Sequence, residues 1–114
     1  MLSPEIQLLL DAANEHLTQA TGRFAMASVI DRHSFEALRT TLPRLVESCR
    51  SSWLLPKDFL SALRSAQCQL LDGSAHSDDP AFLREQAFFL ERAFDALLAG
   101  EGMDDRRPGI PRII

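Results

Sequence analysis

The stretch that decides the fold is 79–100, DPAFLREQAFFLERAFDALLAG. Asp79 can cap a helix through its carboxylate, Pro80 suits the first helical position, and Gly100 is typical of a helix end. Between these signals apolar side chains recur every three or four residues, which predicts an amphipathic helix. This apolar arc is the widest in the chain, so we expect the helix to lie most centrally. The stripe consists of Leu83, Ala87, Leu90, Phe94, Leu97 and Leu98, flanked by Phe82, Phe89 and Ala93.

The same start signal occurs near the beginning of the chain. Ser3 can cap a helix, Pro4 follows it, and Glu5 complements the positive end of the helix dipole. Gly22 is the expected stop of this first helix. Residues 23–30 fit neither a helical nor a strand period, and a short buried helical turn and a packed loop both stay open. The predicted buried stripe is Ile6, Leu9, Leu10, Ala13, Leu17 and Ala20.

Two further helices are predicted between these. One begins near Asp31 or Ser34 and continues through Pro43 as a single kinked helix, because its stripe keeps phase across the proline. The other runs from about Pro56 to Asp72 and ends at Gly73. The stripes are Phe35, Leu38, Leu42, Leu45, Val46, Cys49 and Trp53 in the first, and Phe59, Leu60, Leu63, Ala66, Leu70 and Leu71 in the second.

The fold class that follows is all-α. At 114 residues with 46% hydrophobic and 25% charged residues, the chain has ordinary globular composition and can bury a core. Four helices joined by connections of modest length predict an up-and-down bundle. We expect this bundle domain to span residues 1–103. Residues 104–114 contain Pro108, Gly109 and Pro111 and are expected to form an extended tail.

The composition also narrows the classes of function. The sequence holds no phosphate-binding loop, dinucleotide fingerprint, GxSxG, HExxH or CxxC motif, so we expect no catalytic residue, no cofactor and no metal site. A net charge of −4 makes nucleic acid an unlikely partner. The apolar runs are too short to cross a membrane, and no secretory signal is visible. Two cysteines and a preponderance of Arg over Lys suit a cytoplasmic protein of bacterial origin.

Apolar residues outside the stripes indicate where the protein makes contacts. Phe88 points away from its helix's stripe, between Arg84 and Arg92, and Leu8 lies opposite Leu10. Aromatic residues on polar helix faces are the type that anchors protein interfaces. Cys68 is expected on a polar face, whereas Cys49 is expected in the core. The tail adds three apolar candidates, which either fold back on the bundle or form a short motif for a partner: Ile110, Ile113 and Ile114.

The leading hypothesis is therefore a small cytosolic helical protein that works by protein–protein interaction. Its partner is another protein or a second copy of itself, and an inhibitor, immunity-type, adaptor or chaperone role needs only a shaped helical surface. The acidic first and fourth helices, at −3 each over 3–21 and 74–100 by count of the charged residues, agree with this. The alternative is a sensor or carrier that binds a small apolar ligand among Phe35, Trp53, Phe82, Phe89 and Phe94.

Overall fold

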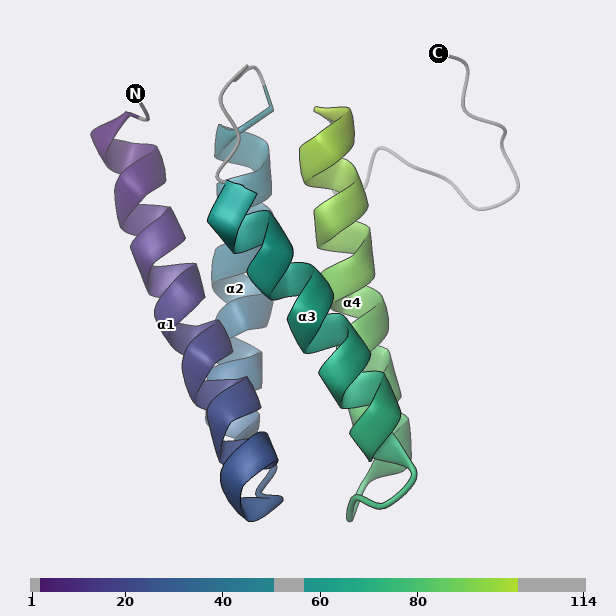
Figure 1. Ribbon diagram of the computed structural model, residues 1–114. Helices are drawn as coiled ribbons and strands as arrows, with labels where there is room; N and C mark the ends of the chain where they lie inside the picture. Colours follow the sequence, from purple (N-terminus) through teal and green to yellow (C-terminus); the bar gives the residue numbers. More distant parts are fainter. Residues whose placement is uncertain (1–2, 51–56, 101–114) are drawn as a thin grey trace.

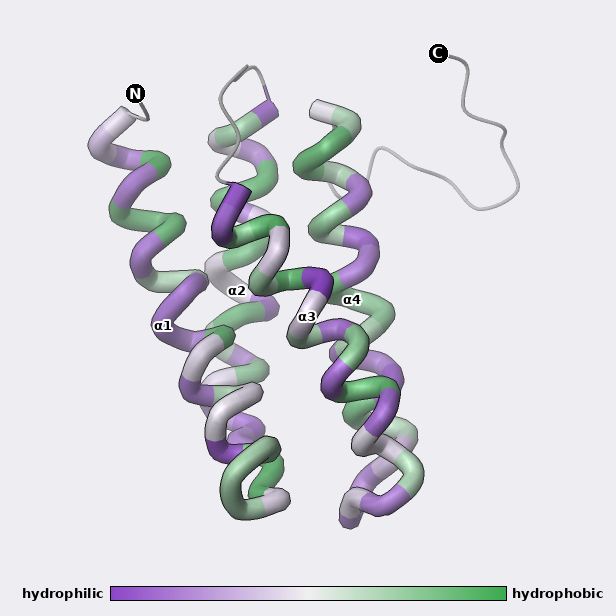
Figure 2. Tube along the Cα trace, viewed as in Figure 1, coloured by the Kyte–Doolittle hydropathy of each residue, from purple (hydrophilic) through white to green (hydrophobic). Residues whose placement is uncertain are grey.

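The computed structural model describes residues 3–50 and 57–100 and is all-α across these ranges. Its four helices are α1 (Pro4–Ala27), α2 (Arg32–Ser48), α3 (Lys57–Ser74) and α4 (Pro80–Ala99). Figure 1 shows them running side by side, and Figure 2 shows hydrophobic and hydrophilic residues alternating along each one, the pattern of amphipathic helices. The all-α class and the number of helices within the described ranges are confirmed.

The helices pack as two hairpins. α1 lies mainly against α2, and α3 lies mainly against α4. The hairpins join through the narrower contacts α1–α3 and α2–α4, whereas α1 and α4 do not pack on each other. Each helix has two neighbours, so a side chain opposite both of them points into solvent.

The predicted caps are confirmed at three helix starts. The Ser3 hydroxyl accepts the Ile6 N–H at 3.2 Å, and the Asp31 carboxylate accepts the Ser34 N–H at 3.2 Å. At α4 the Asp79 carboxylate accepts the Phe82 N–H at 3.1 Å, with Pro80 at the first helical position. Each side-chain oxygen satisfies a backbone donor that the first helical turn leaves unpaired.

Glycine stops were right once and wrong twice. Gly100 ends α4 in the left-handed conformation, with φ of +68°. Gly22 instead lies inside α1, which continues to Ala27 and ends where Ser28 adopts φ of +55°. Residues 23–27 are therefore helical. The reason is tertiary, because the extra turn buries Phe24 against α3.

Gly73 also lies inside its helix rather than after it. It serves as a point of close approach, since a Cβ built there would lie 2.6 Å from Cε2 of the Phe24 ring. Pro43 lies inside α2, which is continuous through it, as the phase of the stripe predicts.

The core follows the predicted stripes, except at their edges. Every described stripe residue of α2 is buried, but Leu71 of α3 and Leu98 of α4 are exposed. Each lies about 100° around its helix from a buried leucine, and that rotation is enough to bring it to the surface. Gln67 and Gln86 are buried among the apolar residues instead. Cys49 is buried and Cys68 is exposed, as predicted.

Candidate protein-interaction surface

The outer surface of α4 carries a large exposed aromatic ring. Phe88 is 62% exposed, although the next residue, Phe89, is buried. Four charged side chains three or four residues away, all exposed, lie on the same side of the helix. We call this set the Phe88 face: Arg84, Glu85, Phe88, Glu91 and Arg92.

The other three phenylalanines of α4 are each covered by an arginine from a neighbouring helix. The guanidinium carbon of Arg32 lies 4.3 Å from the centre of the Phe82 ring, and that of Arg39 lies 4.8 Å from the centre of Phe89. From α3, Arg64 lies 4.7 Å from the centre of Phe94. Within the described residues, Phe88 has no such ring or cation contact.

The phenylalanines of α4 are thus of two kinds, those covered by an arginine and the exposed Phe88. A guanidinium stacked on a ring covers the aromatic surface with a group that is itself well solvated. Arginines of the same chain therefore cover the rings of Phe82, Phe89 and Phe94. Phe88 keeps most of its apolar surface in water, which is the condition expected of an interface anchor.

The seam between α2 and α4 is held by charge as well as by stacking. Arg32 Nη2 donates to Asp79 Oδ2 at 2.8 Å, and Arg39 lies 3.8 Å from the Glu85 carboxylate. The hydrogen bond from Arg32 and the backbone N–H of Phe82 together lower the pKa of Asp79. At the start of α2, the hydroxyl of Ser34 donates to Asp31 at 2.7 Å and lowers the pKa of that carboxyl.

The seam also contains a shallow groove of about 190 Å³. Its residues are charged, aromatic and amide in character, and one of them, Gln86, is only 4% exposed. No fully buried side-chain nitrogen or oxygen of the described residues lacks a hydrogen-bond partner, so the polar atoms of this groove are either paired or open to solvent. The lining residues are Arg32, Phe35, Glu36, Arg39, Phe82 and Gln86.

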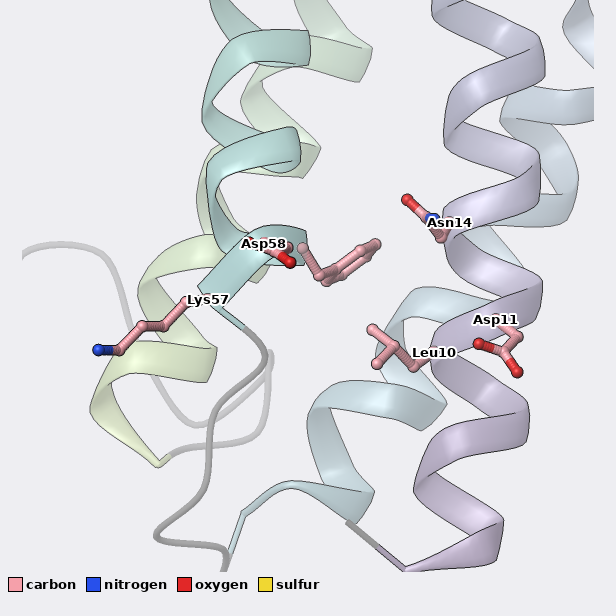
Figure 3. Close-up of a pocket in the computed structure, with 6 residues that line it drawn as sticks. Leu10, Asp11, Asn14, Lys57 and Asp58 are labelled. Atoms are coloured by element: carbon pink, nitrogen blue, oxygen red, sulfur yellow. The ribbon is translucent and has the colours of Figure 1, made fainter. Parts of the chain in front are cut away.

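A second hollow, of about 300 Å³, lies between α1 and α3. Figure 3 shows Leu10 and Asn14 directed from α1 toward α3, while Lys57 points away from α1. Asp11 and Asp58 also line it. The lining of this hollow is more polar than apolar, whereas the exposed lining of the α2–α4 groove is mostly apolar. Phe35 and Phe82, two of the residues expected to hold an apolar ligand, line that groove, and Trp53 lies outside the described residues.

Titratable clusters give no alternative site in the described part of the chain. No group of three or more His, Cys, Asp or Glu residues within 3–50 and 57–100 could hold a metal ion. Burial raises the pKa of the Cys49 thiol, which keeps it protonated in the core. None of the four helices combines the length and the hydropathy that crossing a membrane requires.

The expected interface residues fall into three groups. Phe88, Arg84 and Arg92 lie together on the outer side of α4, as predicted from helical spacing. Leu8 is 72% exposed, but it lies on α1, which does not pack on α4, so it is not part of the same surface. The isoleucines Ile110, Ile113 and Ile114 lie outside the described residues.

Sequence reasoning missed two kinds of feature. It did not find the arginine stacks, although the spacing of seven residues between Arg32 and Arg39 was a signal that both lie on one side of α2. It also missed Met26 and Val29, which are exposed at the end of the α1–α2 hairpin. No family model, curated protein or solved structure matches the chain.

Proposed function

We propose that this protein acts by binding another protein chain through the Phe88 face, in a masking, adaptor or chaperone role without catalysis, in the bacterial cytoplasm. The observation that carries the proposal is the exposure of Phe88 on a helix whose other phenylalanines are each covered by an arginine. Charged side chains surround this ring on both sides, which is the usual arrangement of an apolar anchor within a polar rim.

Burial of the Phe88 ring by a partner is favourable by itself. Full burial of a phenylalanine side chain is favourable by about 1.5–3 kcal/mol. Since Phe88 is 62% exposed, a partner that covers it completely gains roughly 1–2 kcal/mol from this residue. A favourable free energy of this size is expected of a residue that anchors an interface. The isolated chain does not gain it, because the ring stays in contact with water.

The finer architecture belongs to the same proposal. We propose that the helices form an up-and-down bundle with α2 kinked at Pro43. The direction of the chain alternates from one helix to the next in Figure 1, which supports the bundle. Proline removes the N–H that would bond to the carbonyl of Arg39 four residues earlier, which supports the kink.

The test compares three forms of the tagged protein isolated from the cells that produce it. Phe88→Asp adds a charge to the centre of the face, while Met26→Asp makes the same change at an exposed site on α1. The proposal predicts a protein retained by the wild type and by Met26→Asp but lost from Phe88→Asp, with all three equally helical by circular dichroism. Equal retention by Phe88→Asp would overturn it.

A further inference from the structure

The charges of the Phe88 face are arranged as a mirror image about the ring. Arg84 and Glu85 precede Phe88 by four and three residues, and Glu91 and Arg92 follow it by three and four. All four charged side chains are exposed. The order of the charges therefore reads the same from either end of the helix.

Helical geometry divides these charges into two flanks. At 100° per residue, Arg84 and Glu91 lie about 40° and 60° to one side of Phe88, and Glu85 and Arg92 lie at matching angles on the other side. The second flank faces α2, because Glu85 forms its ion pair with Arg39 of that helix. Each flank thus carries one positive and one negative charge, two turns apart.

A second α4 laid antiparallel across the face brings opposite charges together. A twofold axis perpendicular to both helices at Phe88 keeps each flank on its own side and reverses its direction. Arg84 then lies opposite Glu91 of the second copy, and Glu85 lies opposite Arg92 of the second copy. Members of each pair come within about 2 Å of the same level along the axis. Symmetry doubles the number of pairs, while the two Phe88 rings meet at the centre.

Parallel pairing also brings opposite charges together, but in different combinations. A twofold axis along the helices exchanges the two flanks, so Arg84 lies opposite Glu85 of the second copy and Glu91 lies opposite Arg92 of the second copy. The face is therefore complementary to a second copy of itself in both orientations, and the orientations differ in which charges meet.

We infer that the Phe88 face binds a second copy of this chain, with the two α4 helices related by a twofold axis at Phe88. The inference rests on the proposed function, because it assumes that this face is a binding surface, and it names the occupant when no other partner is present. The existing Arg39–Glu85 pair is compatible with it, since that contact is long at 3.8 Å and lies at the edge of the face.

Two double variants of equal composition and equal net charge test the pairing. Arg84→Glu/Glu91→Arg exchanges charges that face each other in the antiparallel dimer, so every pair keeps opposite signs there and acquires like signs in the parallel dimer. Arg84→Glu/Glu85→Arg exchanges charges that face each other in the parallel dimer, so every pair keeps opposite signs there and acquires like signs in the antiparallel dimer. Arg84 and Glu91 are seven residues apart, beyond the three or four that pair within one helix. Recovery in the first variant therefore cannot come from a bond within the chain.

The measurement is sedimentation velocity of the purified full chain from about 10 µM to about 1 mM, because an interface of this size is expected to be weak. We expect a concentration-dependent dimer of twice 12.7 kDa for the wild type. One double variant should associate within about threefold of the wild type and the other at least about tenfold more weakly, and the retained variant identifies the orientation of the two helices. Arg44→Glu, at an exposed site on α2 outside the Phe88 face, is the control and shows how far a charge change elsewhere on the surface alters association.

Two results overturn the inference: a wild type that stays monomeric throughout, or two double variants that associate equally. Either result leaves the proposed function to its own test. A monomeric wild type that retains a different protein, and loses it on Phe88→Asp, would keep the proposed function and remove only the second copy as the occupant.

Discussion

Gly73→Ala places a methyl group where the structure holds an aromatic ring. The added Cβ would lie 2.6 Å from Cε2 and 2.8 Å from Cζ of Phe24, well inside van der Waals contact. Phe24 is 8% exposed, so the ring must move against packed neighbours to make room. Overpacking of this kind costs about 1–3 kcal/mol.

Helix propensity opposes that cost. Alanine is favoured over glycine by up to about 1 kcal/mol inside a helix, but Gly73 is the next-to-last residue of α3, where the gain is smaller. Overpacking therefore dominates. We expect Gly73→Ala to lower the free energy of unfolding by about 1–2 kcal/mol.

Gly22→Ala is the matched control, because Gly22 lies inside α1 and a Cβ there meets nothing within 4 Å. Only propensity acts at this site, so we expect a gain of about 0.5–1 kcal/mol. Urea unfolding followed by far-ultraviolet circular dichroism measures both variants. Phe24→Leu combined with Gly73→Ala should recover much of the loss. If Gly73→Ala proves as stable as Gly22→Ala, the Phe24 ring does not pack closely on Gly73 in the folded protein.

Three further predictions concern other sites. Gly100→Ala should cost about 1 kcal/mol in thermal unfolding, because its φ of +68° is strained for a residue with a Cβ, and an unchanged midpoint would contradict this conformation. Gln86→Leu should raise stability by about 1 kcal/mol in urea unfolding, since an apolar side chain replaces an amide that is only 4% exposed, and a loss would show that the polar contacts of the amide stabilise the fold more than a buried leucine does. Asp31 and Asp79 have lowered pKa values in the folded chain, so the stability that they contribute is complete above the ordinary value of 3.8 and is lost as the pH falls through the folded values. Urea titrations across this range should show a smaller acid-induced loss in Asp31→Asn/Asp79→Asn.

Local signals predicted the helices and most of their starts. A side-chain cap before a helix is a contact within four residues, and so it can be read from Ser3, Asp31 and Asp79 without knowledge of the fold. Helix ends were less secure. Whether glycine ends a helix depends on its φ, and Gly22 and Gly73 keep helical backbone because Phe24 packs between α1 and α3.

Surface features that depend on the spacing of residues within one helix could be predicted from the sequence. Features that depend on how two helices pack could not. The exposure of Phe88 and its charged neighbours follows from the spacing of residues along α4. The arginine stacks on Phe82 and Phe94 require that α2 and α3 lie on either side of α4, and that adjacency is a property of the packed structure.

The most direct test of the central claim is site-specific photo-crosslinking at position 88 in the cells that produce the protein. A photoreactive phenylalanine derivative replaces Phe88 in one form and Met26, at an exposed site on α1, in another. The account predicts a discrete adduct from position 88 that is absent from position 26, with a mass of twice 12.7 kDa where the partner is a second copy and a different mass for another protein. The absence of any adduct specific to position 88 would contradict the claim that this face binds a protein chain.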